Sequence, residues 1–152
     1  MGNQPGEPTC CFCFPMKCGI ILIGVSVFMD LGNDFVMIQK MKEISYLVMA
    51  FYIAAAILVS FAFALFLAYF CSDTPKTRNN LVIACALMIF ANIISYTGIV
   101  LGSIIEDDIP FSSMLTFIPI NGSQILIYYY FRMICKEWAM MGPFPSFSGG
   151  PS

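Results

Sequence analysis

The chain of 152 residues contains no histidine and only one tryptophan, and charged residues make up just 11% of it. The absence of histidine removes the commonest metal ligand and the commonest general base of enzymes. Seven basic residues stand against nine acidic ones, so there is no excess of positive charge to bind nucleic acid. We therefore expect a protein that is not an enzyme, has no metal site or cofactor, and binds no nucleic acid.

Apolar residues dominate what is present: they make up 59% of the chain, whose mean hydropathy is +0.84. Four long apolar runs cover residues 18–38, 44–71, 81–105 and 111–134. A helix of roughly 20 apolar residues crosses the hydrocarbon core of a bilayer, which is about 30 Å thick. Short connections between such helices make neighbours run antiparallel. The sequence predicts an all-α integral membrane protein, an antiparallel bundle of four transmembrane helices.

The distribution of lysine and arginine predicts the orientation of this bundle. Five of the seven basic residues fall at the ends of the runs that lie with the two termini: Lys17, Lys76, Arg78, Arg132 and Lys136. Cytosolic loops carry an excess of Lys and Arg, so we expect both termini in the cytosol. Residues 1–17 would form a cytosolic segment, residues 18–135 the bundle, and residues 136–152 a disordered cytosolic tail rich in Gly, Pro and Ser.

Among the polar residues inside the apolar runs, five form a candidate cluster in the membrane, where a charged side chain costs roughly 3 kcal/mol on insertion scales and needs a reason. They are Asp30, Asp34, Asn92, Asn121 and Gln124. Counting 1.5 Å per residue places Asp30, Asn92 and Asn121 at similar depths, so we expect Asp30 to face the bundle and bond to one of these amides. Two readings stay open: hydrogen bonds that fix helix register, or a small-ion, proton or polar-lipid site. For Asp34, a third reading places it near the outer surface, paired with Lys40 or Lys42.

Small residues predict where helices approach closely. Gly98 and Gly102 form a GxxxG pattern, and Ala64 and Ala68 form a matching pattern of small residues in the second run. Three further small residues, Cys10, Cys11 and Cys13, precede the first run. Thiols next to a membrane helix on the cytosolic side are candidates for palmitoylation, whereas a metal site would need a fourth ligand that the sequence does not supply nearby.

The start of the chain resembles the lysosome-associated transmembrane (LAPTM) family of small tetraspan proteins. The resemblance is carried by Cys10-Cys11-Phe12-Cys13, followed by Lys17 and the glycine-bounded segment from Gly19 to Gly24. It implies four spans and an endosomal or lysosomal location. The Pro-Pro-x-Tyr motifs of that family are replaced here by Pro143-Phe144-Pro145-Ser146.

Three function classes fit these observations. The first is a non-enzymatic tetraspan organiser or adaptor of endomembranes, whose partners would be lipids and other transmembrane proteins or further copies of the chain. The second is an accessory subunit of a larger complex, such as a respiratory or channel assembly. The third is a small transporter or proton pathway that uses Asp30. The mitochondrial inner membrane and the plasma membrane are alternative locations.

Overall fold

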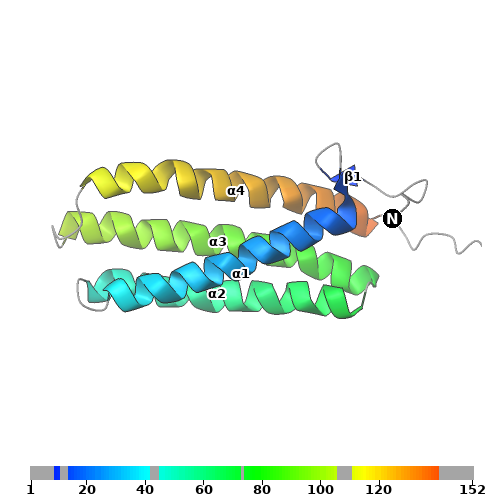
Figure 1. Ribbon diagram of the computed structural model, residues 1–152, viewed down its shortest axis with the longest axis horizontal. Coiled ribbons are helices and arrows are strands. Elements are labelled where there is room, and N and C mark those ends of the chain that lie inside the picture. Colours follow the sequence, from blue (N-terminus) through cyan, green and yellow to red (C-terminus); the bar gives the residue numbers. More distant parts are fainter. Residues whose placement is uncertain (1–8, 11–13, 42–44, 73, 106–110, 141–152) are drawn as a thin grey trace, which may run out of the picture.

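The computed structural model describes residues 9–10, 14–41, 45–72, 74–105 and 111–140. Over this part the chain forms four long helices: α1 (Met16–Met41), α2 (Tyr46–Cys71), α3 (Pro75–Ile105) and α4 (Phe111–Met140). Two strands of two residues each, β1 (Thr9–Cys10) and β2 (Phe14–Pro15), pair before α1. Successive helices run antiparallel, so α1 begins and α4 ends at the same end of the bundle (Figure 1). The prediction of an all-α chain with four helices is confirmed.

Three helices are long and apolar enough to span a membrane: Cys18–Lys40 of α1, and the whole of α2 and α3. Their outward faces carry large apolar side chains, among them Leu22, Phe28, Phe35, Phe61 and Phe90. Apolar surface of this extent is unusual on a soluble monomer, so the helices suggest a membrane-embedded protein. Helix α4 has 30 residues against 31 in α3, but Asn121, Ser123 and Gln124 make its middle more polar. Its crossing of the membrane stays a prediction.

Capping side chains explain why two helices begin where they do. The hydroxyl of Ser45 accepts a hydrogen bond of 3.1 Å from the backbone N–H of Val48 at the start of α2. Before α3, Thr74 and Thr77 exchange bonds between their hydroxyls and backbone N–H groups, and Pro75 takes the first helical position. Helix α3 therefore begins at Pro75, six residues before the apolar run that marks it in the sequence.

Helix α4 continues to Met140, so residues 136–140, which the sequence assigned to a disordered tail, are helical. The reason is the packing of Trp138, which is buried against two other helices. Its ring lies 5.7 Å from that of Tyr69 in α2, and the guanidinium carbon of Arg78 in α3 lies 4.4 Å from its centre. A cation over an aromatic face is a stabilising contact, and here it joins the ends of three helices.

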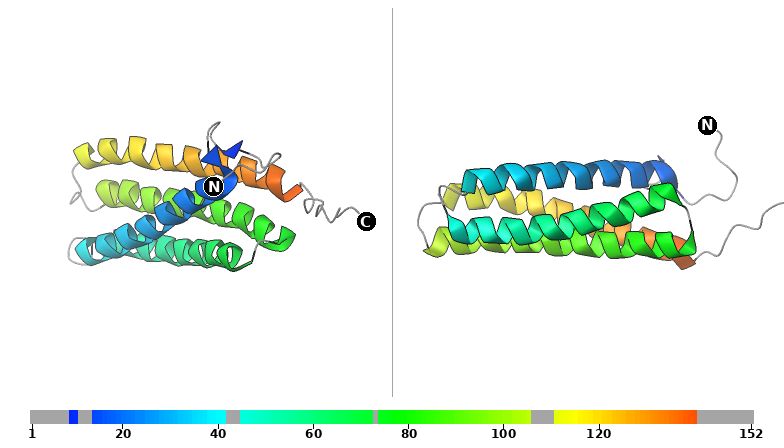
Figure 2. Two further views of the ribbon diagram at one scale, coloured as in Figure 1. Left: turned by 45° about the vertical axis from the view of Figure 1, so that its right-hand side comes forward. Right: turned by 90° about the horizontal axis from the view of Figure 1, so that it is seen from below.

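The helices pack in chain order, α1 on α2, α2 on α3 and α3 on α4. Helix α1 crosses the bundle obliquely and finishes beside the start of α2 (Figures 1 and 2). The main core lies between the four helices, and its largest fully buried side chains include Ile20, Phe66, Leu81, Met88 and Tyr128.

Helices α2 and α3 approach closely at one of the predicted small residues. Gly98 and Gly102 are both buried, and a Cβ atom added to Gly98 would lie only 2.5 Å from the Cβ of Phe51 in α2. Ala64 is exposed and Ala68 is half-buried, so the predicted alanine pattern is not the surface that meets these glycines. Helix α2 instead presents Ala55, Val59 and Ala62 to the core.

Candidate functional site

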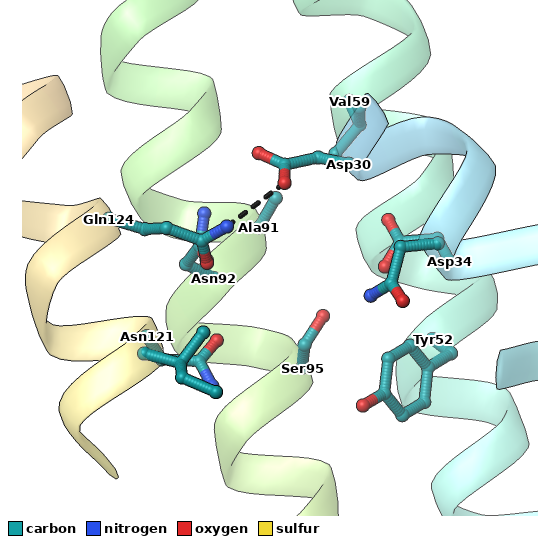
Figure 3. Close-up of a pocket in the computed structure, with 11 residues that line it drawn as sticks. Asp30, Asp34, Tyr52, Val59, Ala91, Asn92, Ser95, Asn121 and Gln124 are labelled. Atoms are coloured by element: carbon teal, nitrogen blue, oxygen red, sulfur yellow. Dashed lines mark hydrogen bonds between the residues drawn. The ribbon is translucent and has the colours of Figure 1, made fainter. Parts of the chain in front are cut away.

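A polar cavity of about 80 Å³ lies between the helices, and all four of them contribute to its lining (Figure 3). The five polar residues singled out in the sequence all line it: Asp30, Asp34, Asn92, Asn121 and Gln124. The structure thus brings together, in one place, side chains from α1, α3 and α4 that are up to 94 positions apart in the chain. Such polar groups within apolar helices mark either a register-fixing network or a binding site.

The cavity lies in the half of the bundle away from the termini. Asp34 is seven residues before the end of α1, and Tyr52 is six residues after the start of α2. At 1.5 Å per residue, both are about 9–11 Å from that end. Ser95, ten residues before the end of α3, is about 15 Å from it by the same measure.

Asp30 is fully engaged by side chains of α4. Its Oδ1 accepts a hydrogen bond of 3.0 Å from Nε2 of Gln124, and its Oδ2 accepts one of 2.6 Å from the hydroxyl of Tyr128. The Tyr128 hydroxyl also lies 3.2 Å from the Oγ of Ser26 in α1. We call Ser26, Asp30, Gln124 and Tyr128 the α1–α4 clasp. It joins the first and last helices by side chains, where their backbones do not pack closely.

The predicted partners of Asp30 were therefore wrong, although its interior position is as expected. Asn92 donates its side-chain N–H to the backbone oxygen of Met88, one turn earlier in its own helix, at 2.9 Å. Asn121 lines the same cavity, but it is Gln124, one turn further along α4, that reaches Asp30. Equal depth in the bundle did not decide the pairing, because depth says nothing about which way a side chain points around its helix.

Asp34 differs from Asp30 in having no hydrogen-bond partner among the described residues, although only 7% of it is exposed. One reading of the sequence placed it near the outer surface in an ion pair with Lys40 or Lys42. No ion pair joins it to Lys40, and Lys42 lies outside the described residues. Asp34 follows Asp30 by one helical turn and points into the bundle rather than outward (Figure 3).

Two hydroxyl groups beside Asp34 were not identified from the sequence. Tyr52 of α2 is 3% exposed and Ser95 of α3 is 9% exposed, and both line the cavity. Neither hydroxyl bonds to a described residue, and Figure 3 shows both side chains beside the space that Asp34 faces, with the Tyr52 hydroxyl at the end of its ring away from Asp34. A buried polar group is normally hydrogen-bonded. These oxygens therefore have bonding capacity that the surrounding described side chains do not use.

The charged side chains of the lining are all acidic, because it holds two aspartates and no described lysine or arginine. Within the described residues, no three His, Cys, Asp or Glu side chains gather as a metal-ion site. The donors are instead carboxylate, hydroxyl and amide oxygens, which bind small hard cations or water. The arrangement is suited to holding a small positively charged or strongly polar guest.

The candidate acylation sites cannot be placed in the same way. Cys11 and Cys13 lie outside the described residues, and Cys10 is described only as part of β1. Cys18 and Cys71, by contrast, are exposed thiols at the end of the bundle where α1 begins.

No protein-family model, no curated protein and no solved structure matches this chain. The resemblance of its N-terminal residues to the LAPTM family therefore stays a prediction, and the functional argument is carried by the geometry of the cavity.

Proposed function

We propose that this chain is a small membrane protein that binds a small polar or cationic solute in the cavity and conducts it through the bundle. This is the transporter or proton-pathway class, with Asp34 rather than Asp30 at its centre. The observation that carries the proposal is the carboxyl group of Asp34, which is buried, faces the cavity and has no described partner.

A purely structural role for the cavity accounts for Asp30 but not for Asp34. Asp30 accepts two hydrogen bonds and ties α1 to α4, which is what a register-fixing residue does. Holding a negative charge within a membrane helix without a hydrogen-bond donor among the described residues is costly, even beside a polar cavity. Evolution retains such groups in membrane helices mainly where protons, ions or substrates bind. A bound proton or cation would remove the charge of Asp34 and so relieve this cost.

The other predicted classes remain predictions without a structural observation that favours them. The exposed apolar side chains of an organiser or an accessory subunit would be covered by partners, but in a membrane lipid covers them equally well. An endosomal or lysosomal location, cytosolic termini, and palmitoylation at Cys10, Cys11 or Cys13 likewise remain predictions.

The test is ion flux through liposomes that contain the purified full-length chain. A potassium gradient with valinomycin sets a membrane potential, and entrapped indicators report the entry of protons and of sodium in parallel. We expect faster entry of one of these ions than into protein-free vesicles. Asp34→Asn should return the rate to that of protein-free vesicles while leaving the helical circular dichroism spectrum intact.

The matched control is Glu137→Gln, which removes an exposed carboxyl group of α4 near the other end of the bundle. It should leave the flux unchanged. Wild-type vesicles that are no faster than protein-free ones, or Asp34→Asn vesicles that are as fast as wild type, would contradict the proposal.

A further inference from the structure

We propose that Asp34 is the anionic ligand of a site for one alkali-metal cation. The hydroxyl oxygens of Tyr52 and Ser95 and the side-chain carbonyl oxygen of Asn92 would complete the ligand set. This inference rests on the proposed function, because it names the guest of the same cavity, but it concerns binding and can be tested without transport.

The two aspartates have different roles because they differ in their hydrogen-bond partners. Both carboxylate oxygens of Asp30 already accept hydrogen bonds, from Gln124 and Tyr128, so each oxygen has a donor within the clasp. Asp34 has no such donors among the described residues. Asp30 is thus a positioning residue that holds α1 against α4, and Asp34 is the carboxylate that is available to bind a cation.

The neighbouring groups supply oxygen in the form that a cation needs. The amide N–H of Asn92 is donated to the backbone oxygen of Met88, which leaves its carbonyl oxygen as the group without a described partner. The buried hydroxyls of Tyr52 and Ser95 are independent of the acidic residues and come from two other helices. Hydroxyl, amide and carboxylate oxygens together form the hard ligand set that alkali and alkaline-earth cations prefer.

The number of available carboxylates favours a monovalent ion. Asp34 is the one carboxylate of the lining without a hydrogen-bond donor among the described residues, whereas protein sites for calcium usually supply several carboxylates. A single water needs about 10–15 Å³ of cavity volume, so a cavity of about 80 Å³ has room for an ion that keeps some of its water. N-methyl-D-glucamine, a much larger organic cation, serves as the comparison.

Cation binding would join α1, α2 and α3 through one ion, so it should stabilise the folded bundle as any ligand of the native state does. The experiment measures thermal unfolding of the full-length chain in detergent, in sodium, potassium or N-methyl-D-glucamine chloride at equal ionic strength. We expect a higher melting temperature in sodium or potassium, rising with concentration. Asp34→Asn should abolish the difference, and Glu137→Gln should retain it.

Ser95→Ala and Tyr52→Phe keep the test decisive if Asp34→Asn does not fold. Each removes one neutral oxygen ligand and should raise the half-saturating concentration of the cation several-fold. Equal melting temperatures in all three salts would overturn the inference, as would an alkali-metal effect that survives in Asp34→Asn.

The two proposals can fail separately. Proton flux that depends on Asp34, together with no effect of sodium or potassium on stability, would leave the proposed function standing and refute the cation site. Stabilisation by sodium or potassium through Asp34, in a chain that conducts no ion, would support the cation site and refute the proposed function.

Discussion

Tyr128 donates a hydrogen bond of 2.6 Å to Oδ2 of Asp30, across 98 positions of the chain, and so connects the last helix to the first. The backbones of α1 and α4 pack mainly on α2 and α3 rather than on each other. The side chains of the clasp therefore link two helices whose backbones pack mainly on their neighbours.

Removing the Tyr128 hydroxyl should weaken this link. Hydrogen bonds between transmembrane helices contribute about 0.6 kcal/mol on average and up to about 1.7 kcal/mol. We expect Tyr128→Phe to lower the free energy of unfolding by an amount in this range, measured by denaturation in mixed micelles. In an Asp30→Leu background the same substitution should have a much smaller effect, because the acceptor is already gone.

Tyr129→Phe is the matched control for this measurement, since Tyr129 is the next residue and is exposed. It should leave stability nearly unchanged. Equal losses for Tyr128→Phe with and without Asp30 would show that the hydrogen bond does not contribute to stability.

Gly98 and Gly32 provide a second pair of matched substitutions. An alanine methyl group at Gly98 would lie 2.5 Å from the Cβ of Phe51, which is too close without movement of the two helices. Overpacking of this kind costs about 1–3 kcal/mol, so Gly98→Ala should melt at a lower temperature in detergent. Gly32 has no neighbouring atom within 4 Å of such a methyl group, so Gly32→Ala should be neutral or stabilising. An unchanged melting temperature for Gly98→Ala would contradict the close contact with α2.

The predicted orientation can be tested with thiol labelling. Cys18 and Cys71 are exposed at the end of the bundle where α1 begins and α4 ends. Gln39 is exposed near the other end of α1. In sealed right-side-out vesicles, a membrane-impermeant maleimide should label Gln39→Cys and leave the wild-type chain unlabelled until detergent is added. Labelling of the wild-type chain in intact vesicles would place its termini outside.

The sequence predicted the elements better than their ends. Apolar runs located four helices because a membrane-spanning helix needs a long stretch without charge. They missed the start of α3, which is polar and depends on Thr74 and Thr77, and the end of α4, which depends on Trp138 reaching two other helices. Neither contact changes the hydropathy of the segment in which it occurs.

Only some of the residues that line the cavity could be predicted from the sequence. Asp30, Asp34 and the three amides stood out because they are rare within apolar helices. Tyr52, Ser95 and Tyr128 did not, because tyrosine and serine are ordinary residues there and only the arrangement of the helices shows which of them face inward. The partners of Asp30 were mistaken, since a rise per residue gives the height of a side chain but not its direction around the helix.

The contact of Trp138 with Arg78 and Tyr69 also gives the chain a built-in optical reporter. Trp138 is its single tryptophan and is buried at the end of the bundle opposite to the cavity. Its fluorescence therefore follows the packing of one end, while circular dichroism follows all four helices. Coincident melting curves from the two signals would show that a guest bound near Asp34 stabilises a single cooperative unit, and separated curves would reveal a bundle that opens from one end.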